Sequence, residues 1–239
     1  LDNLNLALGD ERTSAARRST ARESFENLGR NALEFLLIPL MDGTYFSRMV
    51  SVSGENNLKS ALEKGKGVLL LSCHLGNWEV MAAAMAAKGY PVAIISKVSK
   101  SERVNRIWMG IREKAGVRIL TGRGLIRDAR SHLDSGVIVG FVLDQNARRS
   151  EGLFVPFFGR EACTLKSLAL LARRTGAPVV PAYIYRRGQR HHIVIEPALH
   201  HVAWPDLHAD ILGRTERYTA WTESVVRLHP EQWPWLHDR

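Results

Sequence analysis

The feature that most constrains the fold is the alternation of short, almost wholly apolar runs with longer stretches of helical periodicity. The apolar runs cover residues 67–72, 91–96, 136–143 and 178–185. Runs of this length without polar alternation are typical of strands buried on both faces of a parallel sheet. Because helical stretches separate them, the sequence predicts an α/β fold, a sandwich with a mainly parallel central sheet flanked by helices.

Helices are predicted around these strands, and residues 191–196 are expected to add one further strand. The helical stretches are 11–38, 54–64, 77–88, 102–115, 123–134, 164–175 and 208–228. No internal repeat, low-complexity tract or linker divides the chain, so residues 1–239 are treated as a single domain.

The charge balance restricts the classes of partner. Lysine and arginine outnumber aspartate and glutamate by 33 to 24, which gives a formal net charge of +9. Such an excess favours an anionic partner: nucleic acid, acidic lipid headgroups or an acidic carrier protein. Nucleic-acid binding is not expected, because basic residues are not interleaved with aromatic residues on one face and no known binding motif is present.

The segment around residues 71–79 carries the chemistry. His74 follows a predicted buried strand, at the end of the sheet where open α/β proteins bind ligands. Gly76 permits a tight turn, Asn77 can cap the next helix, and Glu79 falls in its first turn. We interpret His74 as a general base whose second ring nitrogen is held by Glu79, against the alternatives of a structural histidine and, less favoured, a zinc ligand.

Cys73 next to His74 invites a thiol-nucleophile interpretation. Consecutive side chains of an extended strand point to opposite faces, so Cys73 is predicted to belong to the core. The absence of a GxSxG sequence argues against a serine hydrolase mechanism.

In this context the sequence resembles the bacterial late acyltransferases of lipid A biosynthesis (lauroyl/myristoyl type), within the lysophospholipid acyltransferase superfamily. His74 and Glu79 match the superfamily signature of a histidine followed, after four residues, by an acidic residue. Further blocks that resemble the family are residues 144–145, 152–159 with Thr164, 175–181, and 230–237. The resemblance therefore covers nearly the whole chain.

The resemblance implies a glycerol-phosphate-acyltransferase-like fold and an enzyme without a cofactor or metal. It implies transfer of an acyl chain from an acyl carrier protein or coenzyme A thioester to a glycolipid, most simply a lipid A precursor. Phosphatidylinositol mannoside or another lipid is the alternative acceptor, and a thioesterase is the alternative activity. The expected location is the cytoplasmic face of the inner membrane, on anionic lipid.

Membrane contact is expected from residues 1–45. The most apolar run of the chain, residues 33–41, is far shorter than the ~20 residues that a bilayer-spanning helix needs. The chain starts at Leu1 without a signal segment, and an N-terminal anchor is expected to be absent from it.

The resemblance also suggests residues that hold substrate. Arg112 matches a family arginine and suits phosphate groups, and Lys97 replaces the basic contact found in many relatives. Asp144 and Gln145 end a buried strand at the same sheet edge as His74, where they either hold substrate or, for Asp144, orient a basic residue. Phe157 and Thr164 complete the predicted set.

Two groups of residues leave alternatives open. The aromatic stretch 154–158 is predicted either to join the core or to line the acyl-chain groove. The histidines of the 191–201 region lack matching carboxylates and are predicted to be surface residues rather than metal ligands: His191, His192, His200 and His201.

Overall fold

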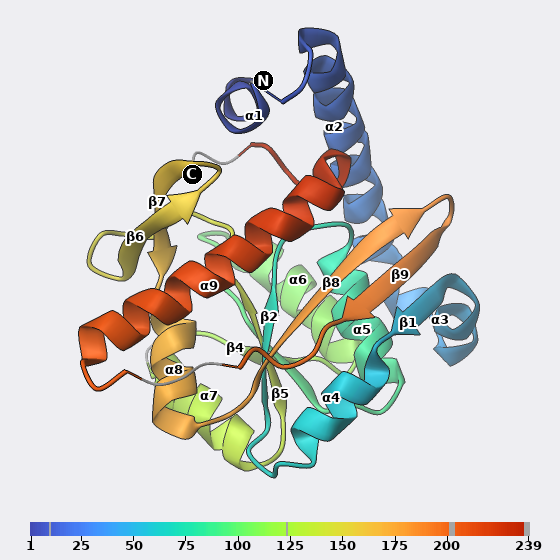
Figure 1. Cartoon of the computed structure of the whole chain (residues 1–239). Helices are drawn as coiled ribbons and strands as arrows, with labels where there is room; N and C mark the ends of the chain where they lie inside the picture. Colours follow the sequence, from blue (N-terminus) through green and yellow to red (C-terminus); the bar gives the residue numbers. More distant parts are fainter. Residues whose placement is uncertain (10, 123, 201–203, 237–239) are drawn as a thin grey trace.

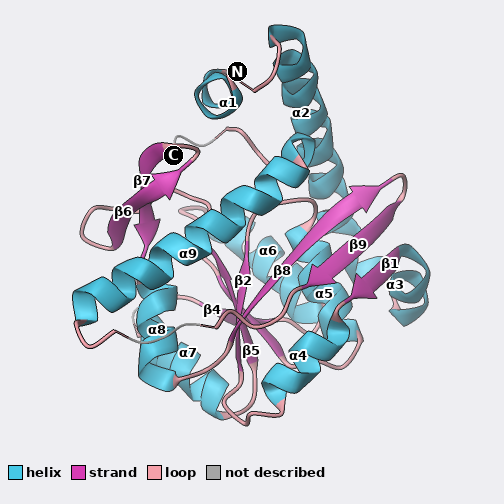
Figure 2. Ribbon diagram, in the orientation of Figure 1, coloured by secondary structure: helices cyan, strands magenta, loops and turns pink. Residues whose placement is uncertain are grey.

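The computed structural model describes residues 1–9, 11–122, 124–200 and 204–236. Seven strands form one sheet in the order β1-β9-β8-β2-β5-β3-β4 (Figures 1 and 2). Their bounds are β1 Val50–Ser53, β2 Val68–Ser72, β3 Val92–Ile95, β4 Arg118–Leu120, β5 Ile138–Val142, β8 Val179–Arg187 and β9 Arg190–Ile195. Within this sheet, β8–β9 is the one antiparallel pair among the described strands, so the predicted α/β fold with a mainly parallel sheet is confirmed.

Helices cover both faces of this sheet. They are α1 Asp2–Leu8, α2 Ser14–Leu37, α3 Gly43–Met49, α4 Glu55–Leu62, α5 Trp78–Ala87, α6 Glu102–Lys114, α7 Leu125–Asp134, α8 Ser167–Thr175 and α9 Leu207–Leu228, with 3₁₀ turns η1 Ile38–Leu40 and η2 Pro230–Gln232. Figure 1 shows α9 running across one face of the sheet.

Alternate side chains of each central strand enter two separate cores. From β2, Leu69 and Leu71 pack with apolar residues of α7, α8 and α9, while Val68 packs with residues of α4 and α5. Both sides of the strand are therefore dry, which explains why the run 67–72 lacks polar alternation.

Several elements were not predicted from the sequence. The edge strands β1 and β4 are short, and their pairing depends on a neighbour that is distant in sequence. The predicted helix 164–175 begins too early, because Thr164 and Leu165 belong to β7 (Arg160–Leu165). That strand pairs with β6 (Gly152–Phe157) in a hairpin beside α9, apart from the main sheet (Figure 2).

Candidate active site

His74 and Asp144 meet because β2 and β5 are parallel neighbours in register. Ser72 at the end of β2 lies opposite Val142 at the end of β5. Two residues beyond each strand, the Nδ1 atom of His74 lies 2.7 Å from Oδ1 of Asp144. The backbone N–H of His74 also donates to Oδ2 of Asp144, at 2.7 Å. The two side chains thus form an acid–histidine pair at the carboxyl edge of the sheet.

This pairing corrects the predicted role of Glu79 as the group that holds the His74 ring. Asp144 occupies that position: it is 1% exposed, and both of its carboxylate oxygens accept hydrogen bonds from protein groups. The contact with His74 agrees with the alternative that Asp144 orients a basic residue. Nε2 of His74 has no hydrogen-bond partner among the described residues and is the nitrogen left to act as a base.

The contact between His74 and Asp144 shifts the pKa of each group so that the charged form is favoured in both. Burial alone would lower the pKa of His74, but the charge and the hydrogen bond of Asp144 outweigh burial and raise it. Burial would likewise raise the pKa of Asp144, yet the charge of His74 and the hydrogen bonds from His74 and Trp233 lower it. Asp144 is therefore an anion that stabilises protonated His74.

Glu79 forms a second ion pair beside the first. Its carboxylate accepts Nε–H of Arg112 at 2.9 Å and Nη2–H at 2.5 Å, in a two-pronged arrangement. Nη1 of Arg112 donates to Oγ of Ser96, and the guanidinium lies 5.8 Å from the ring centres of Phe35 and Trp108. With its side chain 10% exposed, Arg112 holds Glu79, which replaces the predicted role as a direct phosphate contact. The charge of Glu79 still acts on His74, where it raises the pKa.

The loop from His74 to Glu79 has the local chemistry that the sequence predicted. Gly76 has a φ of 54°, and a Cβ atom there would lie 2.2 Å from the carbonyl oxygen of Ile184. Asn77 caps α5 by accepting the N–H of Val80 at 3.2 Å. The Trp78 ring meets the His74 ring edge-on, with centroids 4.7 Å apart.

Lys97 and Gln145 remain candidates for contact with substrate. Lys97 follows β3, the neighbour of β5, and is exposed at the edge where His74 lies. Its charge lowers the pKa of His74. Gln145 is half-buried directly after Asp144.

Thr164 and Phe157 lie behind the site. Thr164 is fully buried and near Thr219 of α9, with their Oγ1 atoms 3.4 Å apart, so the predicted direct contact with substrate does not fit its position. Phe157 is also buried, and its ring packs against Phe158 and Trp233. In the stretch 154–158, Phe154 and Pro156 are exposed. The core alternative holds for Val155, Phe157 and Phe158, which are buried.

The predictions for Cys73 and for the histidines near β9 can be compared with their burial in the structure. Cys73 is buried in the core, as predicted. His191 was predicted to be a surface residue, which is wrong: it is fully buried and faces Glu34 of α2, with Nε2 and Oε1 3.3 Å apart. His192 is half-buried and bonds Ser51, His200 is exposed, and His201 lies outside the described residues. Within the described ranges, no three His, Cys, Asp or Glu side chains are grouped so as to hold a metal.

A polar network that sequence reasoning missed ties α2 to the loop of His74. Glu34 forms an ion pair with Arg186 of β8 and accepts the side-chain N–H of Asn77 at 2.7 Å. The Asn31 side chain donates to the carbonyl of Gly76. Burial would raise the pKa of Glu34, but the hydrogen bonds of Arg186 and His191 lower it strongly. The buried residues of α2 are mostly polar, and they include Asn27 and Asn31, which precede Glu34 on the same side of the helix.

Exposed apolar side chains gather beside this site. We define the α2–α6 apolar surface as these residues of α2, η1 and α6: Leu33, Leu36, Leu37, Leu40, Val104, Ile107 and Trp108. Trp108 meets the buried Phe35 ring edge-on at 5.8 Å, which joins the two helices. In the described part of the chain, no helix has both the length and the apolar character needed to cross a bilayer.

Comparison with known proteins shows the family to which the sequence is similar. The sequence model of the family described as bacterial lipid A biosynthesis acyltransferase matches residues 1–239. The chain is 24% identical to the phosphatidylinositol mannoside acyltransferase of Mycobacterium tuberculosis (strain CDC 1551 / Oshkosh), over 90% of this chain and 70% of that protein. It is 24% identical to the lipid A biosynthesis lauroyltransferase of Escherichia coli (strain K12), over 99% and 76% of the two chains. A lipid A biosynthesis acyltransferase of Haemophilus influenzae is 23% identical over 77% of this chain and 56% of its own length.

Among solved structures, the chain is similar to the 1-acyl-sn-glycerophosphate acyltransferase of Thermotoga maritima. The TM-score is 0.45 and the sequence identity 17%, with 96% of this chain and 97% of that chain covered.

Proposed function

Because the chain belongs to the bacterial lipid A biosynthesis acyltransferase family, we propose that it transfers a fatty acyl chain to a hydroxyl of a glycolipid, with His74 as the general base. The donor is an acyl thioester of acyl carrier protein or coenzyme A, and the acceptor is a lipid A precursor. The observation that carries the proposal is the pairing of His74 with Asp144, which leaves Nε2 of His74 available to take a proton.

The chemistry needs no covalent acyl-enzyme. Nε2 of His74 takes the proton of the acceptor hydroxyl while the hydroxyl oxygen attacks the thioester carbonyl carbon. The tetrahedral intermediate collapses, the carbon–sulfur bond breaks, and the leaving thiolate takes the proton from the imidazolium. Asp144 stabilises that imidazolium through Nδ1, as the acid does in acid–histidine pairs of hydrolases.

The neighbouring charges divide the remaining tasks. Arg112 and Glu79 fix the start of α5 and hence the loop that carries His74. Lys97 is exposed at the same edge, so we assign it to a phosphate of the acceptor or donor. Its position near His74 also favours the neutral imidazole that a general base requires.

We place the protein on an anionic lipid surface, at the cytoplasmic face of the inner membrane. The α2–α6 apolar surface supports contact with lipid, because it lies close to the site. Trp108 of this surface packs against Phe35, both rings contact Arg112, and Arg112 binds Glu79. Exposed basic residues accompany it on α6 and before it, among them Lys100, Arg103 and Arg106. An apolar face with a basic rim is the pattern of helices that lie in a membrane interface.

Lipid A precursor and phosphatidylinositol mannoside are the two acceptors that the relatives' names suggest. The chain is equally similar, at 24% identity, to a lipid A lauroyltransferase and to a phosphatidylinositol mannoside acyltransferase. We favour the lipid A precursor because the family match covers the whole sequence.

The test is an assay of the purified chain with radiolabelled acyl thioester and each acceptor in mixed micelles, with products identified by mass spectrometry. Label on the glycolipid supports transfer, whereas label only in free fatty acid would establish a thioesterase and overturn the proposal. His74→Ala is expected to reduce transfer by about 10²-fold or more in a folded protein. Near-normal transfer by that variant would exclude His74 as the base.

A further inference from the structure

The geometry points to Trp233 as a positioning residue that fixes the catalytic carboxylate through its indole N–H. Nε1 of Trp233 donates to Oδ2 of Asp144 at 2.7 Å. The inference rests on the proposed acyl transfer by His74. It assigns a role to the C-terminal segment 230–235.

The hydrogen bonds to Asp144 show why one donor matters. Oδ1 accepts Nδ1–H of His74, and Oδ2 accepts both the backbone N–H of His74 and the indole N–H of Trp233. Two of these bonds come from His74 itself. Trp233 supplies a donor from outside that loop, so it defines the plane of the carboxylate independently of the residue that Asp144 must orient.

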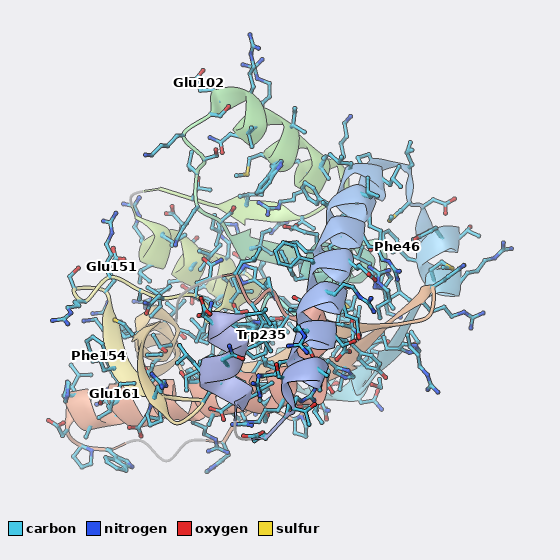
Figure 3. The ribbon with its side chains drawn as sticks, turned by 90° about the horizontal axis from the view of Figure 1, so that it is seen from above. Phe46, Glu102, Glu151, Phe154, Glu161 and Trp235 are labelled. Carbon is cyan, nitrogen blue, oxygen red and sulfur yellow. The ribbon has the colours of Figure 1, made fainter. Side chains whose placement is uncertain are left out.

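Trp233 is itself held rigidly. It is 3% exposed, and its ring meets those of Phe157 and Trp235 edge-on, with ring centroids 6.1 Å and 4.7 Å apart. Its carbonyl oxygen accepts Oγ–H of Ser24 at 2.6 Å. Figure 3 shows Trp235 beside α1, and its carbonyl oxygen accepts a side-chain N–H of Asn3 at 3.0 Å.

The same segment also holds the loop after His74. The carbonyl of Gln232 accepts the N–H of Gly76 at 3.1 Å and a side-chain N–H of Asn27 at 3.3 Å. Consecutive residues, Gln232 and Trp233, thus bind the loop of the base and the carboxylate of its partner. This arrangement fixes the two halves of the pair relative to each other.

The consequence concerns the chemical step rather than binding. A buried carboxylate stabilises the developing imidazolium only while its oxygen remains aligned with Nδ1. Without the indole donor, Oδ2 loses one of two hydrogen bonds and the carboxylate can rotate in its pocket. Turnover should fall while affinity for substrates is kept, because Trp233 is buried behind Asp144.

The primary test is Trp233→Phe, which keeps an aromatic ring and removes the donor. We expect kcat to fall by about 10-fold with KM for donor and acceptor unchanged within about two-fold. Trp221→Phe is the matched control, because Trp221 is similarly buried and its Nε1 donates to a carboxylate oxygen of Glu196 at 2.9 Å. An equal loss in both variants, or a loss expressed in KM, would overturn the inference.

A double-mutant comparison shows whether Trp233 acts through Asp144. In an Asp144→Asn background, Trp233→Phe should reduce kcat by less than about two-fold, because the group that it positions is already lost. A full additional 10-fold loss would mean that Trp233 acts elsewhere. Wild-type protein without measurable transfer would instead refute the proposed function.

A spectroscopic test does not require Trp233→Phe to fold. The protein is labelled with ¹⁵N-tryptophan and carries Trp78→Phe, because the Trp78 ring contacts His74 and would itself respond to its titration. One of the remaining indole resonances, that of Trp233, should move with the titration of the His74–Asp144 pair. That response should vanish in folded Asp144→Asn and persist in Trp221→Phe. An indole spectrum without any titrating resonance would overturn the inference, whether or not acyl transfer is detected.

Discussion

At the scale of single residues, the partner of His74 determines the pH range of activity. A general base must be neutral, and Asp144 raises the pKa of His74 above its ordinary value of 6.5. Activity should therefore be lost as pH falls through a value above 6.5. In Asp144→Asn the opposing charge is gone and burial remains, so the acidic limb should move below that of the wild type.

The measurement is the pH profile of kcat/KM, which reports the free enzyme's base. Asp144→Asn should also lower the plateau by on the order of 10²-fold, because the imidazolium is no longer stabilised. The exposed Lys97→Ala serves as a control with the opposite sign: its charge lowers the pKa of His74, so its removal should move the limb to higher pH. An Asp144→Asn limb at the wild-type position would contradict the pairing.

Also at the residue scale, Arg112 should stabilise the protein more than its surface neighbours do. Its removal leaves the buried Glu79 carboxylate without its paired charge, although the indole N–H of Trp78 still donates to it at 3.2 Å, and breaking a pair of this kind costs about 3 kcal/mol. Arg112→Ala should therefore lower the urea midpoint strongly, and adding Glu79→Gln should restore part of the loss. Lys97→Ala is the control, and equal midpoints for it and Arg112→Ala would show that the ion pair adds no stability.

At the scale of elements, the two faces of the α2–η1 segment should respond differently to polar substitution. Leu36 and Leu40 are exposed, the latter by 80%, whereas Phe35 and Ile38 are buried in the core. The double substitution Leu36→Ser and Leu40→Ser should weaken vesicle binding and leave the melting temperature unchanged. Phe35→Ser should instead destabilise the fold by about 3 kcal/mol, as truncations of buried aromatic residues do.

Sedimentation with vesicles, together with circular dichroism, separates the two effects. Because Trp108 belongs to the same surface and is 47% exposed, Trp108→Ser should add to the loss of binding. Unchanged sedimentation of the Leu36/Leu40 variant would remove this surface from the membrane contact.

At the scale of the whole molecule, the net charge of +9 predicts the lipid preference. Each basic residue near an anionic surface adds on the order of 1 kcal/mol of attraction, which salt screens. The chain should bind anionic vesicles, bind neutral vesicles less well, and dissociate as salt is raised. Equal binding to both kinds of vesicle at all salt concentrations would contradict an electrostatic contribution.

The sequence alone determined the class of fold because each central strand is buried on both faces. Dry strands must be continuously apolar, so β2, β3, β5 and β8 were visible as uninterrupted runs. The cap at Asn77 and the turn at Gly76 were likewise predictable, since both depend on residues close in sequence. Edge strands and the β6–β7 hairpin carry no such signal, because their partners define them.

Only the tertiary structure decided which carboxylate serves His74. Glu79 is five residues away along the chain, yet it turns to Arg112, while Asp144 arrives from a strand 70 residues later. The strand order of a parallel sheet brings the ends of β2 and β5 together, and sequence spacing holds no record of that order. The role of Trp233 could not be predicted from the sequence for the same physical reason. Its side chain reaches Asp144 because segment 230–235 packs between α2 and the loop of His74.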